Sequence, residues 1–171
     1  MEIFLTLSIR ARVAYGILCL EQTLHKLGYD YYHWQFLLDT LWSYTYSNLG
    51  EWHMIVAEIT PLSIMGDGEY NTFDFECITM EQYSLLKKMY SKIPKEYFVI
   101  FELIFEIGTK DLYASIVNGS KETHIFLSAI VKVLQDNKIE VPDIPKFLIK
   151  QGIEENYGWG NPFYRKAIFD V

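Results

Sequence analysis

The chain has 171 residues, of which half are apolar and 16% are aromatic, and its formal net charge is −7 at pH 7. This composition excludes an intrinsically disordered chain, because there is enough apolar surface to offset the conformational entropy lost on folding. The basic residues are scattered and form no positive stripe that could displace counterions from a phosphate backbone, so we expect no nucleic-acid partner.

The apolar segments favour a cytoplasmic protein that does not enter the membrane. The longest apolar run, Phe98 to Ile107, contains two glutamates and is shorter than the roughly 20 residues that cross a bilayer. Arg10 and Arg12 follow the apolar start of the chain, whereas the basic residues of a secretory signal precede its apolar part. Cys19 and Cys77 match no zinc or redox spacing, so we expect buried, reduced thiols and no cofactor.

The first third of the chain predicts three helices joined by short links. In the first of them, apolar residues recur at steps of three and four, at Ile9, Val13, Ile17, Leu20, Leu24 and Leu27. Gly28 is placed to end this helix, and Glu21 and His25 lie one turn apart as an expected surface pair. Asp30 is suited to cap the second helix, and Asn48 and Gly50 are expected to separate the second helix from the third. These two helices carry three tryptophans, expected in the core: Trp34, Trp42 and Trp52.

The middle of the chain predicts a loop followed by two more helices. Proline and glycine make Pro61 to Ile78 an expected loop. Thr79 and Gln82 have the spacing of a capping box, which predicts a helix to about Ser91. The nearly all-apolar segment from Tyr97 predicts a largely buried helix that continues past Gly108 to Ile116.

The last third predicts a long helix from a Ser120 cap to Asn137 and a short one from about Asp143 to Gln151. The aromatic, glycine-rich tail, Gly152 to Val171, is expected to pack back on the helices, with Gly158-Trp159-Gly160 as a tight turn. The predicted fold is therefore all-α: one domain over residues 1–171, an antiparallel bundle of about six to seven helices with a packed irregular C-terminal tail.

Glu102 and Glu106 are the strongest candidates for chemistry, because they lie one turn apart on the most apolar predicted helix. Together with a histidine they could serve a small enzyme or a ligand-binding helical domain. The histidines, however, form no Glu-x-x-His or His-x-x-x-His pattern with metal-ligand spacing. We therefore favour a solvent-facing pair, or a pair bound to an arginine of the first helix, and predict no catalytic or metal site.

Four strings of the sequence resemble a group of small helical bacterial proteins, the immunity proteins of polymorphic or contact-dependent toxin systems. The strings are Arg12 to Glu21, Leu41 to Thr45, Glu51 to His53 and Tyr157 to Phe163. The resemblance implies a non-enzymatic protein that neutralises a cognate toxin domain by covering it. The acidic charge fits such a role, because many toxin nucleases present basic surfaces.

The resemblance defines no contact residue, so the contact surface is a separate hypothesis. The loop from Asp67 to Glu76 combines acidic and aromatic side chains, and the candidates for partner binding are Asp67, Glu69, Tyr70, Asp74 and Glu76. We expect a monomer or a weak homodimer. The alternatives are the Glu102/Glu106 enzyme and a structural subunit of a larger assembly, which the aromatic excess favours.

Overall fold

The computed structural model describes residues 2–66, 68–117 and 119–169. Over these ranges the chain forms nine α-helices and four 3₁₀ turns without a β-strand, so the all-α prediction is confirmed. Six of the helices exceed two turns, in agreement with the six or seven expected. The other three have four residues each: α1 (Ile3–Thr6), α5 (Pro61–Ile64) and α9 (Lys146–Ile149). No described helix combines the length and the apolar character needed to span a membrane.

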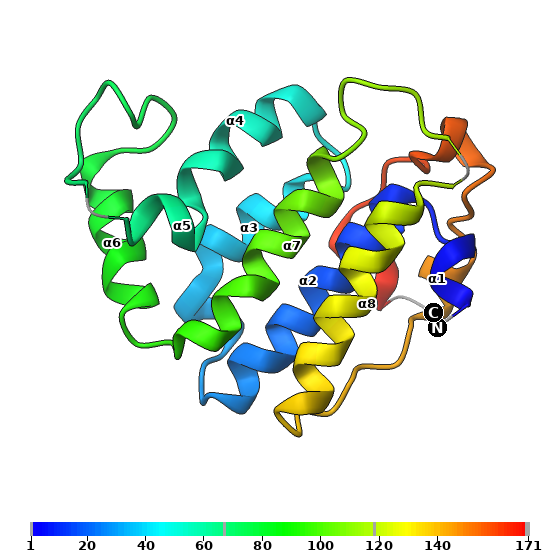
Figure 1. Ribbon diagram of the computed structural model, residues 1–171, viewed down its shortest axis with the longest axis horizontal. Coiled ribbons are helices and arrows are strands. Elements are labelled where there is room, and N and C mark those ends of the chain that lie inside the picture. Colours follow the sequence, from blue (N-terminus) through cyan, green and yellow to red (C-terminus); the bar gives the residue numbers. More distant parts are fainter. Residues whose placement is uncertain (1, 67, 118, 170–171) are drawn as a thin grey trace.

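The centre of the bundle is made by three long helices, α2 (Ile9–Lys26), α7 (Phe98–Thr109) and α8 (Lys121–Asp136). In Figure 1, α7 runs opposite to both α2 and α8. Every residue of α2 from Ile9 to Leu20 is buried, so α2 is enclosed on all sides for most of its length. This explains why its sequence is apolar beyond the single face that the helical periodicity defined.

The three remaining long helices of the bundle are α3 (Gln35–Ser43), α4 (Leu49–Ile59) and α6 (Met80–Tyr90). The predicted capping box of Thr79 and Gln82 is confirmed at the start of α6, and α4 begins directly after Asn48, whose side chain caps it. Asp30 caps a 3₁₀ turn, Tyr31–Trp34, that leads directly into α3. As predicted, three tryptophan side chains lie in the core, with at most 2% of each exposed: Trp34, Trp42 and Trp52.

Gly108 marks the closest approach between α7 and α4. A Cβ atom at this position would lie 2.8 Å from two ring carbons of Trp52 and 3.0 Å from the ring of Tyr44. Only a residue without a side chain lets the Trp52 indole reach the α7 backbone. The absence of a side chain at Gly108 therefore lets α7 and α4 pack closely at this point.

Three predicted boundaries are wrong. The expected loop over Pro61–Ile78 begins with the helix α5, because the Thr60 side chain accepts a hydrogen bond from the Ser63 backbone N–H and the proline needs no such bond. The helix α7 ends at Thr109 and does not continue to Ile116. Ser120 precedes α8, but its hydroxyl donates a hydrogen bond to the Asp111 carboxylate and makes no cap.

Arg12 is a fully buried cation that joins three segments of the fold. Its guanidinium donates hydrogen bonds to the backbone oxygens of Phe4 at 3.0 Å, Leu5 at 3.2 Å and Ser120 at 2.8 Å. It also donates to the Thr123 hydroxyl at 2.6 Å. Burial lowers the pKa of Arg12 to about 10, and the Asp111 charge opposes this shift. Arg12 thus links α1, the start of α8 and α2 around a desolvated charge.

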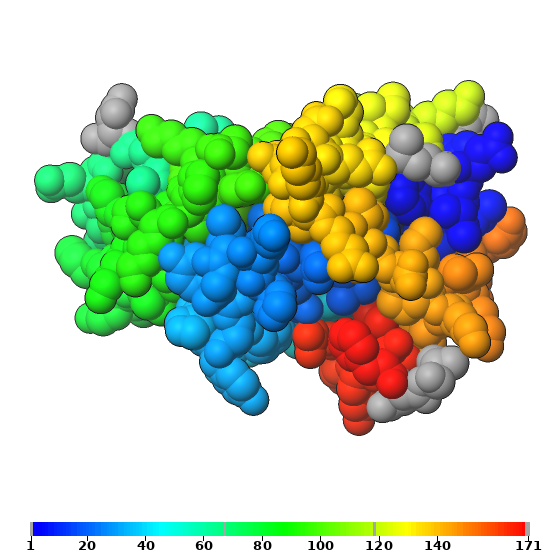
Figure 2. Space-filling view, turned by 90° about the horizontal axis from the view of Figure 1, so that it is seen from below, coloured from blue at the N-terminus to red at the C-terminus, as the bar shows by residue number. Residues whose placement is uncertain are grey.

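The C-terminal tail packs on the helices, as predicted. Its backbone bonds to the start of α2, from the Arg10 N–H to the Trp159 oxygen at 3.1 Å, and to the turn after α3, from the Phe163 N–H to the Thr45 oxygen at 2.9 Å. Gly158 has φ of +94°, as the expected tight turn requires. In Figure 2 the tail, in red, is separated by a notch from the blue segment that leads into α3.

Candidate protein-binding surface

The segment between α5 and α6, residues 68–78, is called the acidic loop here. It forms one end of the molecule in Figure 1. Although it contains no regular element, the Glu58 carboxylate of α4 holds its backbone. The two oxygens of Glu58 accept hydrogen bonds from the N–H groups of Glu76 at 2.9 Å, Cys77 at 2.9 and 3.0 Å and Ile78 at 3.1 Å. One side chain thus fixes three successive residues of the loop.

An aromatic cluster fixes the other side of the acidic loop. Tyr70 stacks on Phe75, with ring centroids 5.7 Å apart, and Phe75 meets Tyr83 of α6 edge-on at 4.9 Å. The Tyr70 hydroxyl donates to the Ile78 backbone oxygen at 3.2 Å. Tyr70 is therefore half-buried and anchors the loop.

The predicted contact residues fall into two groups, those exposed on the acidic loop and those that help to anchor it. Three of them, Glu69, Asp74 and Glu76, are exposed on the loop surface, whereas Tyr70 is half-buried and contributes to the anchoring. Asp67 lies outside the described residues. The exposed carboxylates are therefore available to a partner, while the tyrosine supports the backbone that presents them.

Phe73 is a feature of this loop that the sequence reasoning missed. Its side chain is 88% exposed, the largest fraction among the apolar residues of the loop. The Asn71 side-chain oxygen accepts hydrogen bonds from the N–H groups of Phe73 at 3.0 Å and Asp74 at 2.9 Å. This Asx turn points the ring into solvent. Asn71, two residues before Phe73, is the sequence signal that could have located it.

A hollow of about 360 Å³ lies between the acidic loop and α4. Three carboxylate residues contribute to its wall, Glu58, Glu69 and Asp74, and Glu58 is already engaged by the loop backbone. The hollow and the exposed Phe73 ring are features of the same loop. A partner that covers this loop would meet an apolar ring and a negative concavity together.

Glu102 and Glu106 line a separate hollow of about 470 Å³. One oxygen of Glu102 accepts a hydrogen bond from the Leu62 N–H at 2.8 Å, so this carboxylate supports the start of α5. The expectation was a solvent-facing pair or a pair bound to an arginine of the first helix, and the partly buried Glu102 fits neither. Burial raises the pKa of Glu102, and the hydrogen bond from Leu62 opposes the shift. Glu106 is exposed. The described residues that line the hollow are Pro61, Leu62, Met65, Gly66, Lys95, Phe98 and the two glutamates, with no histidine among them.

The cysteines differ from each other. Cys19 is fully buried, and burial raises the pKa of its thiol to about 12, against the effect of a hydrogen bond from Tyr15. It is the inert core thiol that the sequence predicts. Cys77 was expected to be buried and is only partly so. In the described part of the chain, no group of three or more histidine, cysteine, aspartate or glutamate residues is arranged to hold a metal ion.

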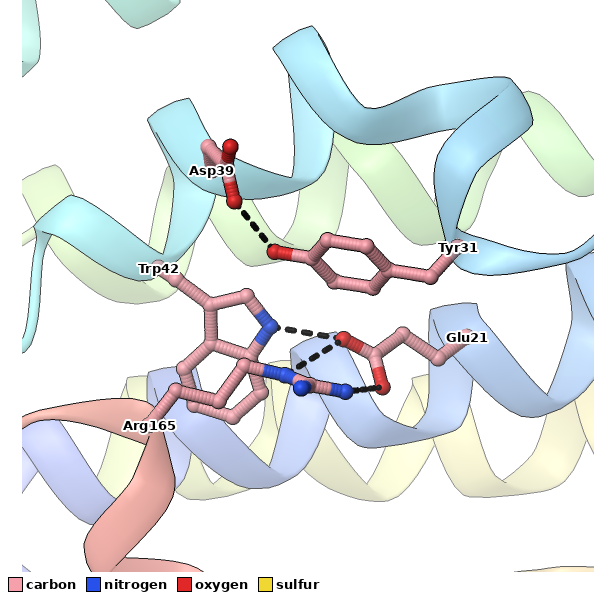
Figure 3. Close-up of polar contacts among 5 residues, drawn as sticks. All are labelled: Glu21, Tyr31, Asp39, Trp42 and Arg165. Atoms are coloured by element: carbon pink, nitrogen blue, oxygen red, sulfur yellow. Dashed lines mark hydrogen bonds and ion pairs between the residues drawn. The ribbon is translucent and has the colours of Figure 1, made fainter.

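A polar cluster joins the tail to α2 and α3 (Figure 3). The Glu21 carboxylate accepts hydrogen bonds from Trp42 Nε1 at 2.6 Å and from Arg165 Nε at 3.3 Å and Nη2 at 3.0 Å. Beside it, the Tyr31 hydroxyl donates to the Asp39 carboxylate. The prediction that Glu21 pairs with His25 is wrong, because the carboxylate turns toward α3 and the tail.

Two hollows meet at this cluster. The first, of about 330 Å³, is lined mainly by α2, the turn after it and the tail, and the second, of about 510 Å³, lies between α3 and the tail. Tyr31 and Arg165 belong to the walls of both. No local pattern indicates this arrangement, because Glu21 and Arg165 lie near opposite ends of the chain.

Comparison of the chain with known protein families, curated proteins and solved structures found no match. Its function is therefore inferred from its own residues and their geometry.

Proposed function

We propose that this chain is a non-enzymatic binding protein of the immunity type, which neutralises a cognate bacterial toxin domain by covering it with the acidic loop. The observation that carries the proposal is the presentation of Phe73, 88% exposed, on a loop whose backbone is fixed by Glu58 and Asn71. Aromatic side chains are enriched in the buried centres of protein interfaces, and an exposed ring on a fixed backbone is available for such burial.

The fixed loop favours tight binding, since a partner does not have to order it. Ordering of interface loops and side chains is among the largest losses on association, and a preformed loop avoids it. The exposed carboxylates Glu69, Asp74 and Glu76 place negative charge on the same loop as this ring. Such charge increases the association rate with a basic surface and selects against acidic proteins.

The toxin as partner is supported by the resemblance of four sequence strings to immunity proteins, and by a net charge of −7 that complements basic toxin nucleases. Within this proposal the protein acts in the cytoplasm as a monomer or weak homodimer. It needs no cofactor, nucleic acid or membrane, since an occluding protein carries out no chemistry of its own.

The proposal is tested by capture of the tagged full-length protein from its native cells in two variants. The loop variant combines Phe73→Ala, Glu69→Gln and Glu76→Gln, which remove exposed groups and leave Glu58, Asn71 and Tyr70 in place. The matched control combines Ile125→Ala, Glu96→Gln and Glu122→Gln, which remove one exposed apolar and two exposed acidic side chains elsewhere.

We expect the wild type and the control to retain one toxin domain in near-equal amount and to suppress its growth inhibition on co-expression. The loop variant should bind that domain at least about tenfold more weakly, because a central aromatic residue and its surrounding charges dominate interface energy. Unchanged binding by the loop variant would exclude the acidic loop as the contact surface. A captured partner without toxic activity would exclude the immunity role.

A further inference from the structure

We propose that Glu21, Tyr31 and Trp42 form a binding site for the guanidinium group of an arginine from a partner protein, which Arg165 of the tail occupies in this structure. These three residues are called the arginine cage below. The site is separate from the acidic loop and lies between the tail, α2 and α3 (Figure 3).

The geometry of the cage is that of guanidinium recognition. The Arg165 carbon Cζ lies 4.5 Å from the centre of the Tyr31 ring and 5.6 Å from that of Trp42. Two of its nitrogens donate to the two oxygens of Glu21 at 3.3 and 3.0 Å. A planar group that stacks on rings and donates two parallel hydrogen bonds is a guanidinium, whereas an ammonium offers one compact charge. The cage therefore selects arginine over lysine.

The cage is built before any arginine enters it. Trp42 Nε1 donates to Glu21 at 2.6 Å, which orients the carboxylate independently of the tail. Tyr31 is likewise held by its hydrogen bond to Asp39. Trp42 is 2% exposed and fixed by the core, so its ring keeps its position when Arg165 leaves. A site held in this way binds a new guanidinium without reorganisation.

Arg165 is the part of this arrangement that can be exchanged. Its side chain is 37% exposed and lies in the walls of both hollows, so its rotation into solvent would join them into one groove. The groove would then expose the carboxylates of Glu21, Asp30 and Asp39 beside apolar walls. This charge fits an arginine of a partner segment, with room on either side for its neighbouring residues.

The test uses full-length protein labelled with ¹⁵N, with the indole N–H resonance of Trp42 as reporter. The probes are N-acetyl-arginine amide and N-acetyl-lysine amide at matched ionic strength. They are titrated into the wild type, Arg165→Ala, Arg165→Gln, Arg165→Ala with Glu21→Gln, and the control Lys166→Ala, which removes a neighbouring tail cation and leaves Arg165 in place.

We expect the arginine probe to shift the Trp42 resonance in both Arg165 variants and to raise their melting temperature. The lysine probe and the Glu21→Gln double variant should bind at least about tenfold more weakly, because the paired hydrogen bonds are lost. The wild type and Lys166→Ala should also bind at least about tenfold more weakly, because Arg165 competes for the same site.

Equal binding of both probes, or arginine binding that survives Glu21→Gln, would overturn the proposal. The same conclusion follows if neither folded Arg165 variant responds to the arginine probe. Arg165→Gln preserves the length and polarity of the side chain, so a folded variant is available if Arg165→Ala proves unstable. None of these results depends on the acidic loop, so either proposal can fail without the other.

Discussion

Arg165 in the C-terminal tail donates hydrogen bonds to both carboxylate oxygens of Glu21, which lies in the second half of α2. Its guanidinium also lies 5.0 Å from the ring of Phe169 in the same tail. The pair therefore connects the last described turn of the chain to its most buried helix.

The first prediction concerns the strength of this connection. Arg165→Met keeps the apolar stem and removes the charge, and Glu21→Gln keeps an acceptor for Trp42. A double-mutant cycle by urea unfolding should give a coupling of about 1 kcal/mol, since the paired bonds strengthen an ion pair that solvent partly screens. A coupling near zero, with both variants folded, would show that this ion pair does not help to hold the tail.

The second prediction concerns the buried Arg12. Arg12→Met preserves much of the side-chain volume but removes the Arg12 donors to the backbone oxygens of Phe4 and Leu5, and one of the donors to the Ser120 oxygen, which also accepts from the Thr123 hydroxyl. The free energy of unfolding should fall by about 3 to 5 kcal/mol, because buried polar partners lose their compensation. Lys121→Met, at an exposed position of α8, should change it by less than about 0.5 kcal/mol. Similar losses in both variants would contradict the role of Arg12.

The third prediction concerns Glu102. Burial raises the pKa of this carboxyl group above its ordinary value of 4.5. A carboxyl group with a raised pKa in the folded state stabilises the fold below its unfolded pKa. That contribution is lost as the pH rises through the folded pKa. Glu102→Gln keeps an oxygen for the Leu62 N–H and removes the titration.

The difference in unfolding free energy between Glu102→Gln and the wild type should therefore grow in favour of the variant from about pH 4 to about pH 8. The measurement is urea unfolding of both proteins across this range. All other titrating groups are shared, so the difference isolates Glu102. A difference that is constant with pH would show that the group keeps its ordinary pKa.

The fourth prediction concerns Gly108. A methyl group at this position would lie 2.8 Å from the Trp52 ring, which the surrounding core prevents from moving. Gly108→Ala should lower the free energy of unfolding by about 1 to 3 kcal/mol, although alanine is the better helix former. The same change at Gly50, near the exposed start of α4, provides the comparison by thermal unfolding. Stabilisation of Gly108→Ala would mean that α4 and α7 can separate freely.

The fifth prediction distinguishes the two thiols. Cys77 is partly exposed and Cys19 is fully buried with a pKa of about 12. A chromogenic disulfide reagent at about pH 8 should modify one thiol in the native protein and the second only after unfolding in urea. Cys77→Ser should abolish the native reaction. Native modification of two thiols would show that the centre of α2 becomes accessible.

The sequence by itself determined most of the elements of this fold. Its apolar periodicity located α2, and the Thr79–Gln82 capping box located the start of α6, because caps and helical faces are set by residues within a few positions of each other. The same local logic identified Glu69, Asp74 and Glu76 as exposed acidic residues of a loop.

Local patterns failed where a contact from a distant segment decided the outcome. The helix α7 ends at Thr109, and in the turn that follows, the Asp111 carboxylate accepts a hydrogen bond from the Ser120 hydroxyl. Because this hydroxyl is engaged by Asp111, it does not cap α8 as expected. Nothing local to Glu58 marks it as the anchor of the acidic loop, because its carboxylate meets the N–H groups of Glu76, Cys77 and Ile78 only in the folded chain.

The arginine cage depended entirely on tertiary structure. A carboxylate on a helix has several partners within reach of its own turn, and the sequence favoured His25 for Glu21 on that ground. Only folding brings the tail past α3, where Trp42 orients the carboxylate and Arg165 can meet it with two donors. Sequence distance carries no information about such a pair, since burial and hydrogen-bond geometry are properties of the assembled core.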